Sequence, residues 1–201
     1  MAKKIKLTRP ELKRYRDAMD RYIRYLPMLK LKQQQLQMSI RDINKQLKQI
    51  IKEVQIVNNE FQPYSHITND IAGLNVKLLA KPVEVRTVST NIAGVKIPVF
   101  EQISFSDQIY SLFGTPAWVD SVLEQMKLIN TKQAQLDILN KQHELLQKEL
   151  TKINQRVNLF EKVKIPECKE AIHLIRIKLG DEMTAAVVRS KIAKTKLAGV
   201  S

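Results

Sequence analysis

Apolar side chains recur at alternating intervals of three and four residues from Leu12 to Phe61, and the alternation never slips. A mean spacing of about 3.5 residues keeps these side chains on one side of an α-helix, where a second helix must cover them. Seven heptads exceed the three or four at which this pattern becomes persuasive. With a rise of about 1.5 Å per residue, the predicted helix is ~75 Å long. The positions of this first seam are Leu12, Tyr15, Met19, Tyr22, Leu26, Leu29, Gln33, Leu36, Ile40, Ile43, Leu47, Ile50, Val54, Val57 and Phe61.

The first helix has a recognisable start and two unusual internal residues. Thr8 as N-cap, Pro10 in the first turn and Glu11 three residues after the cap predict where it begins. Pro27 removes one backbone hydrogen bond and predicts a bend, but not a break, because the apolar period passes through it unchanged. Gln33 is the one polar seam residue, and such residues set helix register and pairing or contact a third partner.

The pattern changes after the first seam, in a central connection that spans residues 62–116. Residues 83–87 and 95–99 alternate between apolar and polar side chains, with turn-forming residues between them. They predict a β-hairpin over about 83–100, in which Pro98 confines its strand to a sheet edge. An isolated hairpin is marginally stable, so it must pack on the helices or on another protein. The flanking stretches have no period, and we expect residues 101–115 to be irregular.

A second seam starts at Trp118 and, after an interruption at Pro166, continues as a shorter stripe to Ala186. Beyond it, small residues alternate with basic ones, and a slim basic helical tip of this kind suits a narrow socket. The second seam comprises Trp118, Val122, Gln125, Ile129, Lys132, Leu136, Leu139, His143, Leu146, Leu150, Ile153, Val157 and Phe160, and the stripe comprises Cys168, Ile172, Ile175, Leu179, Met183 and Ala186.

Two long seams joined by a folded middle cover each other when they pair antiparallel. We therefore predict an all-α fold, a long antiparallel two-helix coiled coil with a short β-hairpin in the central connection. Residues 1–61 form the N-terminal long helix, and residues 117–201 form the C-terminal long helix, kinked near residue 166. The whole is one extended domain, with both basic termini at one end and the hairpin towards the other.

Basic charge is concentrated towards both termini of the chain, whose formal net charge is +14. Residues 1–60 hold 15 basic and 6 acidic side chains, residues 61–160 hold 10 and 9, and residues 161–201 hold 9 and 5. This distribution suits nucleic acid, an anionic membrane surface or an acidic protein cavity as the partner. A solvated, lysine-rich helix face explains much of the charge, but not its concentration at the two ends.

The sequence offers no constellation for catalysis or ligand binding. It has neither of the glycine-rich phosphate-binding patterns GxxxxGK[ST] and GxGxxG, and His66, His143 and His173 lack the close spacing of zinc ligands. Cys168 is the single cysteine, which excludes an internal disulfide, fits a reducing compartment and is expected to be a buried thiol. We predict no catalytic, cofactor-binding or metal-binding residues. An enzyme whose residues converge only in three dimensions stays open from the residues alone, although a two-helix rod offers few concave places for an active site.

The cellular location of the protein is predicted from two features that the sequence lacks. The basic N-terminal segment has no apolar core of a secretory signal, and no run approaches the ~20 apolar residues of a membrane helix. We expect a cytoplasmic protein, unless a partner tethers it to a membrane.

Three segments in the same order resemble those of the D subunit of the V-type and A-type ATPases. The opening segment has LTR at 7–9, LK at 12–13 and MLKLK at 28–32, the middle one has NIAGVKIP at 91–98, and the last has RVNLFE at 156–161 followed by IP at 165–166. They are similar to the family's TR…L…LLKxK, IAGV-x-x-P and RVNALE…IP. The chain departs from the family at 24–27, where RYLP replaces a small-residue and Gly-His pair, and at 180–184, where GDEMT thins out an acidic run.

The resemblance implies a non-catalytic central rotor shaft of a rotary ATPase or ATP synthase. In that family the paired termini insert into the hexamer of catalytic and non-catalytic nucleotide-binding subunits, a small partner in the central stalk, the F subunit, binds the shaft, and the base rests on the subunit that couples to the membrane ring. Rotation of the shaft links ATP hydrolysis or synthesis to ion translocation. The resemblance implies no cofactor, no direct contact with nucleic acid, no insertion into the membrane, and a cytoplasmic position peripheral to it.

Two other functions remain open from the residues alone. The first is a nucleic-acid-binding coiled-coil arm, which the charge favours, although base stacking needs exposed aromatic side chains. Five aromatic residues fall on the predicted seams instead: Tyr15, Tyr22, Phe61, Trp118 and Phe160. The second is a chaperone or tether like the prefoldins, which also join paired helices through a hairpin, but the helix length argues against it.

Overall fold

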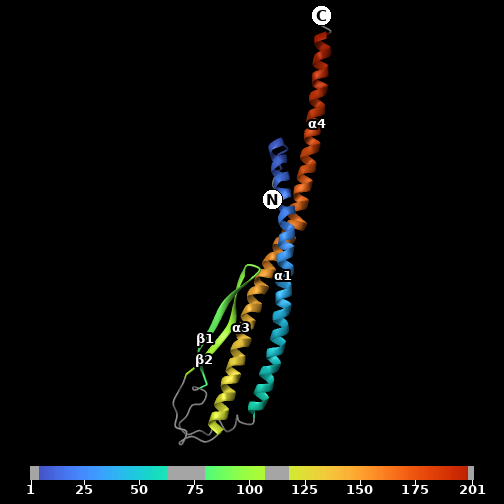
Figure 1. The fold of residues 1–201 in the computed structure, drawn as a ribbon. Coiled ribbons are helices and arrows are strands. Elements are labelled where there is room, and N and C mark those ends of the chain that lie inside the picture. Colours follow the sequence, from blue (N-terminus) through green and yellow to red (C-terminus); the bar gives the residue numbers. More distant parts are fainter. Residues whose placement is uncertain (1–4, 63–79, 107–117, 199–201) are drawn as a thin grey trace. The chain divides into compact units, whose positions relative to one another are not determined.

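The structure is a computed structural model that describes residues 5–62, 80–106 and 118–198 (Figure 1). Long helices predominate, and the two strands form one antiparallel sheet, which confirms the predicted all-α class with a small hairpin. Most of the two stretches without a predicted period lies outside the described residues. In chain order the elements are α1 (Arg9–Phe61), β1 (Pro82–Ile92), β2 (Val95–Phe105), α3 (Trp118–Asn158), the π-helix η3 (Leu159–Lys164) and α4 (Ile165–Ala198).

The chain divides into two compact units. Unit 1 contains Met1–Gln33 and Lys152–Ser201, and unit 2 contains Gln34–Thr151. The two terminal segments therefore share one unit, and the hairpin belongs to the other.

Both predicted seams are covered by neighbouring side chains. All fifteen positions of the first seam and all thirteen positions of the second are buried or half-buried. Leu36, Leu146 and Ile153 are among the largest fully buried side chains. Since one helix cannot cover its own seam, this burial confirms the predicted pairing of two helices.

Helix α1 starts where its capping sequence predicts. The N–H of Leu12 donates to the carbonyl of Thr8 at 3.0 Å, so Thr8 is the residue whose carbonyl accepts the first hydrogen bond of the helix. The helix then continues for 53 residues and passes through Pro27 without ending. The sequence pattern predicted that the helix would not break at this proline, and the helix is unbroken there.

In unit 1, α1 packs against η3 and α4. The rings of Tyr22 and Phe160 lie 4.9 Å apart between centroids, and Lys30 Nζ lies 2.9 Å from Glu161 Oε1. The buried residues of α4 are Cys168, Ala171, Ile172 and Ile175. These contacts join the first and last parts of the chain.

Near Pro166 the helix changes its hydrogen bonding and does not end. The six residues Leu159–Lys164 form a π-helix, in which the N–H of Ile165 bonds to the carbonyl of Phe160. Pro166 has no N–H, and its ring excludes the carbonyl four residues earlier, so a wider turn just before it accommodates the proline. The structure thus has a π-helical turn just before Pro166, and the kink predicted near residue 166 stays a prediction.

In unit 2, β1 and β2 form a tight hairpin. The connecting residues Ala93 and Gly94 have φ of 50° and 81°, the pattern of a two-residue turn whose twist matches that of the strands. Pro98 pairs opposite Ser89, and among the described residues the sheet contains β1 and β2 alone, so each is an edge strand. The predicted edge position of this proline is therefore confirmed.

The hairpin is longer than the predicted 83–100. Residues 101–105, which we expected to be irregular, complete β2, because Gln102, Ile103 and Ser104 pair with β1 beyond a shift in register. The shift, between Arg86 and Thr87 of β1, places one extra residue on β2 and breaks its apolar alternation. That break is why the sequence pattern ended the strand too early.

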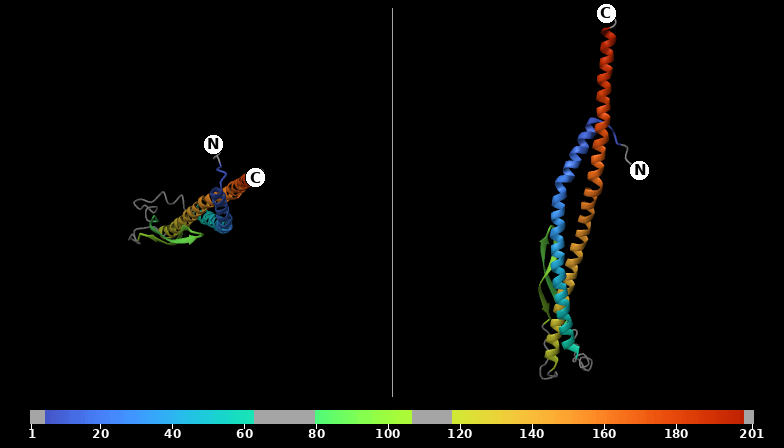
Figure 2. Two further views of the ribbon diagram at one scale, coloured as in Figure 1. Left: turned by 90° about the horizontal axis from the view of Figure 1, so that it is seen from above. Right: turned by 90° about the vertical axis from the view of Figure 1, so that its right-hand side faces the viewer.

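The hairpin packs along α3 within unit 2 (Figure 2). Gln142 Nε2 donates to the carbonyl of Pro98 at one end, and Asn130 Nδ2 donates to the carbonyl of Ala80 at the other, at 2.7 Å. A small core beside Ala80 joins the end of α1 to the start of α3. It consists of Ala80, Val119, Val122 and Leu123, with Phe61, Trp118 and Met126 packed against it.

Candidate functional site

The described residues do not assemble a metal site. Across the ranges 5–62, 80–106 and 118–198, no three His, Cys, Asp or Glu side chains lie close enough to hold an ion. Among the histidines, His143 is half-buried on the second seam and His173 is exposed on α4, whereas His66 lies outside the described residues. Nor does any helix in these ranges have the length and apolar character of a membrane span.

The single cysteine is a packed side chain. Cys168 is buried on α4, as its seam position predicts, and it forms no disulfide. Burial raises the pKa of its thiol, and the neighbouring Glu167 carboxylate adds to the effect. A raised pKa keeps the sulfur protonated, which makes it a poor nucleophile.

Two of the polar seam residues, Gln33 and Lys132, pair across the helices. Gln33 Nε2 donates to Asn154 Oδ1 at 2.8 Å in unit 1. In unit 2, Lys132 Nζ donates to Glu53 Oε2 at 2.7 Å, and this bond, helped by Gln49, holds the pKa of the Glu53 carboxyl below its usual range. Each pair joins α1 to the opposite helix, so these residues align the two helices.

Unit 2 also contains an open groove of about 600 Å³ between α1, the hairpin and α3. Its apolar lining includes Ile43, Ile97 and Ile138, and its polar lining includes Gln46 and Gln135. The spacing of the seam residues could not predict this groove. Its lining depends on how the hairpin packs against the helix residues beside the seams. The available signal is a broader apolar face on α3, where Ile138 adjoins the seam residue Leu139.

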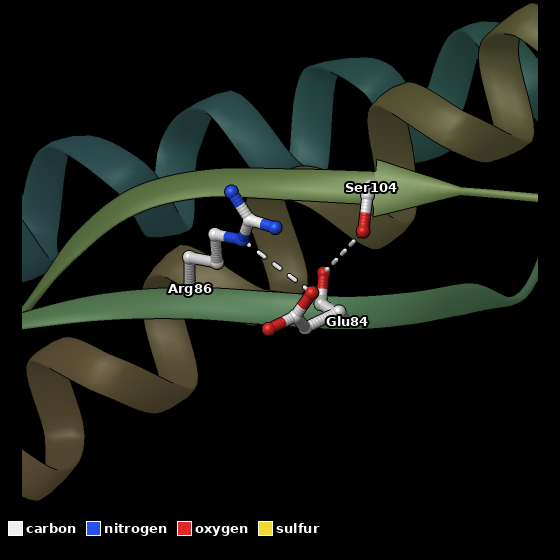
Figure 3. Close-up of polar contacts among 3 residues, drawn as sticks. All are labelled: Glu84, Arg86 and Ser104. Carbon is white, nitrogen blue, oxygen red and sulfur yellow. Dashed lines mark hydrogen bonds and ion pairs between the residues drawn. The ribbon is translucent and has the colours of Figure 1, made fainter.

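Two polar contacts lie at the base of the hairpin, one between the strands and one within β1. Ser104 Oγ donates to the Glu84 carbonyl at 3.3 Å, and Arg86 Nε lies 3.4 Å from Glu84 Oε2 (Figure 3). Val83 and Val88 of β1 are exposed. The hairpin thus presents apolar side chains of β1 that are exposed in the described part of unit 2.

The end of α4 is an uncovered helix. Every residue from Gly180 to Ala198 is exposed, including Met183 and Ala186, the last two positions of the predicted stripe. The chain contains no acidic residue after Glu182, whereas Arg189, Lys191, Lys194 and Lys196 are basic. We call residues 180–198 the C-terminal tip.

The two units differ in net charge. Unit 1 holds 22 basic and 8 acidic residues, so it carries the entire net charge of +14, whereas unit 2 holds 12 of each and is neutral. The sequence located the charge at the termini, and the fold brings both termini into one unit. An electrostatic partner is therefore expected to meet unit 1.

Comparison with known proteins identifies the family. The family of the ATP synthase D subunit matches residues 11–195. The V-type ATP synthase D subunit of Borreliella burgdorferi is 45% identical over 199 residues, covering 96% of this chain and 95% of that protein. Proteins of the same name in Chlamydia pneumoniae and Chlamydia trachomatis serovar L2 are each 28% identical, covering 98% of this chain and 95% and 98% of their own lengths. The resemblance of the three sequence segments is thereby confirmed, and the chain belongs to the family of the ATP synthase D subunit.

Proposed function

We propose that this chain is the non-catalytic central rotor shaft of a V-type rotary ATPase or ATP synthase. The C-terminal tip and the adjoining end of α1 insert into the hexamer of catalytic and non-catalytic nucleotide-binding subunits. ATP hydrolysis or synthesis takes place in the hexamer, and the shaft transmits torque between that reaction and ion translocation. The small F subunit of the central stalk binds its side, and the subunit that couples to the membrane ring binds its base, so the chain lies peripheral to the membrane in the cytoplasm.

The observation that carries this proposal is the C-terminal tip. Nineteen consecutive exposed helical residues leave Met183, Val187 and Leu197 open to water. Apolar side chains on a helix are stabilised when another surface covers them. A basic, slim helix in a chain of this family is suited to a narrow socket in a larger complex.

The paired helices supply the stiffness that torque requires. Helix α1 is 53 residues long, and α3, η3 and α4 follow one another without a loop. Close packing of the seams resists twisting, because core side chains occupy defined positions and leave few voids. The described residues support a mechanical role and offer no reaction centre of their own.

Purification of the tagged chain from native lysate tests the proposal. A wash at ~0.5 M salt removes partners held only by charge. We expect nucleotide-binding subunits and ATPase activity to stay bound. A variant that ends after Leu179 should lose them while it remains folded, because the residues removed are exposed.

Two outcomes contradict the proposal. Full retention of the hexamer by the truncated variant would exclude insertion of the tip. RNA that elutes with salt, without ATPase subunits, would favour the nucleic-acid-binding arm.

A further inference from the structure

Unit 1 contains a second groove, of about 470 Å³, between α1 and α4. Seam residues Met19 and Ile172 contribute its apolar lining. Polar side chains flank them on both helices: Arg16 and Asp20 from α1, and Lys169, His173 and Arg176 from α4. We call these seven residues the cationic groove.

The cations of this groove form no ion pair with the described residues of the chain. Arg16, Lys169 and Arg176 face only one carboxylate in the lining, that of Asp20, and none of these four makes an ion pair within 4.0 Å among the described residues. Elsewhere in the same unit, Lys30 and Lys164 do pair with carboxylates. The groove therefore keeps an excess of positive charge over an apolar surface.

The spacing of the cations suits several carboxylates better than one compact anion. Lys169 and Arg176 are seven residues apart on α4, which separates them by ~10 Å along the helix axis. Alternate side chains of an extended peptide point the same way and are ~7 Å apart, so two or three carboxylates reach such a set together. A single phosphate is compact and reaches only one of these two positions at a time.

We propose that the cationic groove docks an acidic segment of a partner protein. Arg16 and Arg176 bind its carboxylates, for which the guanidinium offers paired N–H donors, and Lys169 supplies a further point charge. Met19 and Ile172 pack against the aliphatic stems of its glutamate side chains. The identity of the partner rests on the proposed function, under which the segment belongs to a nucleotide-binding subunit of the hexamer.

The test uses the full chain and an octaglutamate peptide at ~0.15 M salt, with calorimetry as the readout. The groove variant is Lys169→Gln/Arg176→Gln. Its matched control is Lys191→Gln/Lys194→Gln in the tip, which removes the same two charges. We expect the groove variant to bind the peptide about tenfold more weakly and the control to stay within about twofold of the unmodified chain. All four side chains are exposed, so the fold should persist, and circular dichroism checks this.

Ring resonances of two histidines give a readout specific to position. His173 lies in the groove, whereas His143 lies in unit 2. Addition of octaglutamate should shift the His173 signals and leave those of His143 unchanged. This readout needs no variant.

Three results would overturn the inference. Equal losses in both double variants would mean that the peptide responds to net charge alone. An unmoved His173 would place the peptide elsewhere. Tighter binding of tripolyphosphate or of an oligouridylate to the groove than of octaglutamate would assign it to phosphates. All three measurements use the isolated chain. They can therefore fail while the tip still binds the hexamer in the lysate experiment, so the two proposals are tested independently.

Discussion

The side-chain amide of Gln33 donates a hydrogen bond to Oδ1 of Asn154 across the two helices of unit 1, at 2.8 Å. Gln33 is the one polar position among fifteen on the first seam. The sequence left two roles open for it, register and contact with a third partner, and this bond favours register. Shifting one helix by a heptad would leave two partly buried amides without partners, and that cost selects the observed pairing.

Breaking this pair should cost more than replacing it. We expect Asn154→Ala to lower the free energy of unfolding by about 1 kcal/mol, because the Gln33 amide then loses its partner. The double variant Gln33→Leu/Asn154→Leu should recover that loss or exceed the stability of the unmodified chain, since apolar residues suit the seam. Urea unfolding of the single and double variants measures both effects, and strictly additive changes would show that the amides do not act as a pair.

The ion pair between Lys132 and Glu53 predicts a pH dependence of stability. Hydrogen bonding to Lys132 lowers the folded-state pKa of Glu53 from its ordinary value of 4.5. A carboxyl with a lowered folded-state pKa stabilises the fold above its unfolded pKa, and this contribution is lost as pH falls through the folded pKa. Lys132→Met should therefore destabilise the chain more at pH 7 than at pH 3.

The exposed pair of Lys148 and Glu144, on one helix, provides the control for this titration. Lys148→Met should change stability less than Lys132→Met at pH 7, because exposed pairs within a helix contribute little. Urea unfolding at the two pH values measures both variants. A Lys132→Met effect of equal size at pH 3 and pH 7 would mean that packing of the lysine stem, not the charge pair, provides the stability.

Ala93 adopts an unfavourable backbone conformation. Its φ of 50° lies in the left-handed region, which crowds a β-carbon. Ala93→Gly or Ala93→Asn should stabilise the hairpin by up to about 1 kcal/mol, and Ala93→Val should destabilise it. Amide hydrogen exchange within β1 and β2 measures the change, and a less protected hairpin in Ala93→Gly would contradict the assigned turn.

Two isoleucines of α4, one buried and one exposed, allow the cost of losing core packing to be compared with that of a surface change. Ile175 is 0% exposed and Ile177 is 50% exposed. Ile175→Ala should cost about 2–4 kcal/mol because it leaves a cavity in unit 1, whereas Ile177→Ala should stay within about 0.5 kcal/mol. Thermal unfolding of both variants tests this difference. Similar costs for the two variants would contradict the burial of Ile175 in the core of unit 1.

The helices could be predicted from the sequence because helical burial has a local period. The seam from Leu12 to Phe61 marks α1 almost to its ends, and Trp118 marks the start of α3. The strands were harder to delimit because the register shift after Arg86 disrupts the alternation that defines them. The π-helix before Pro166 and the packing of Ile97 beside α3 depend on contacts between distant segments, which no local period records.

The two candidate binding surfaces also differ in how far the sequence predicts them. The basic character of the tip is visible in the sequence, since residues 183–201 contain no acid. The cationic groove is not visible there, because Arg16 and Arg176 are 160 positions apart and meet only when α1 packs on α4. Its residues could be grouped only once the fold was known.

Rotation of the chain within its complex tests the central claim most directly. The hexamer is fixed to a surface, and a bead is attached to the hairpin through Gln102→Cys in a Cys168→Ser background, since Gln102 is exposed. A torque-transmitting shaft predicts that the bead turns in one direction when ATP is added and stops when ATP is removed. A bead that stays still while the same complexes hydrolyse ATP would contradict the rotor function.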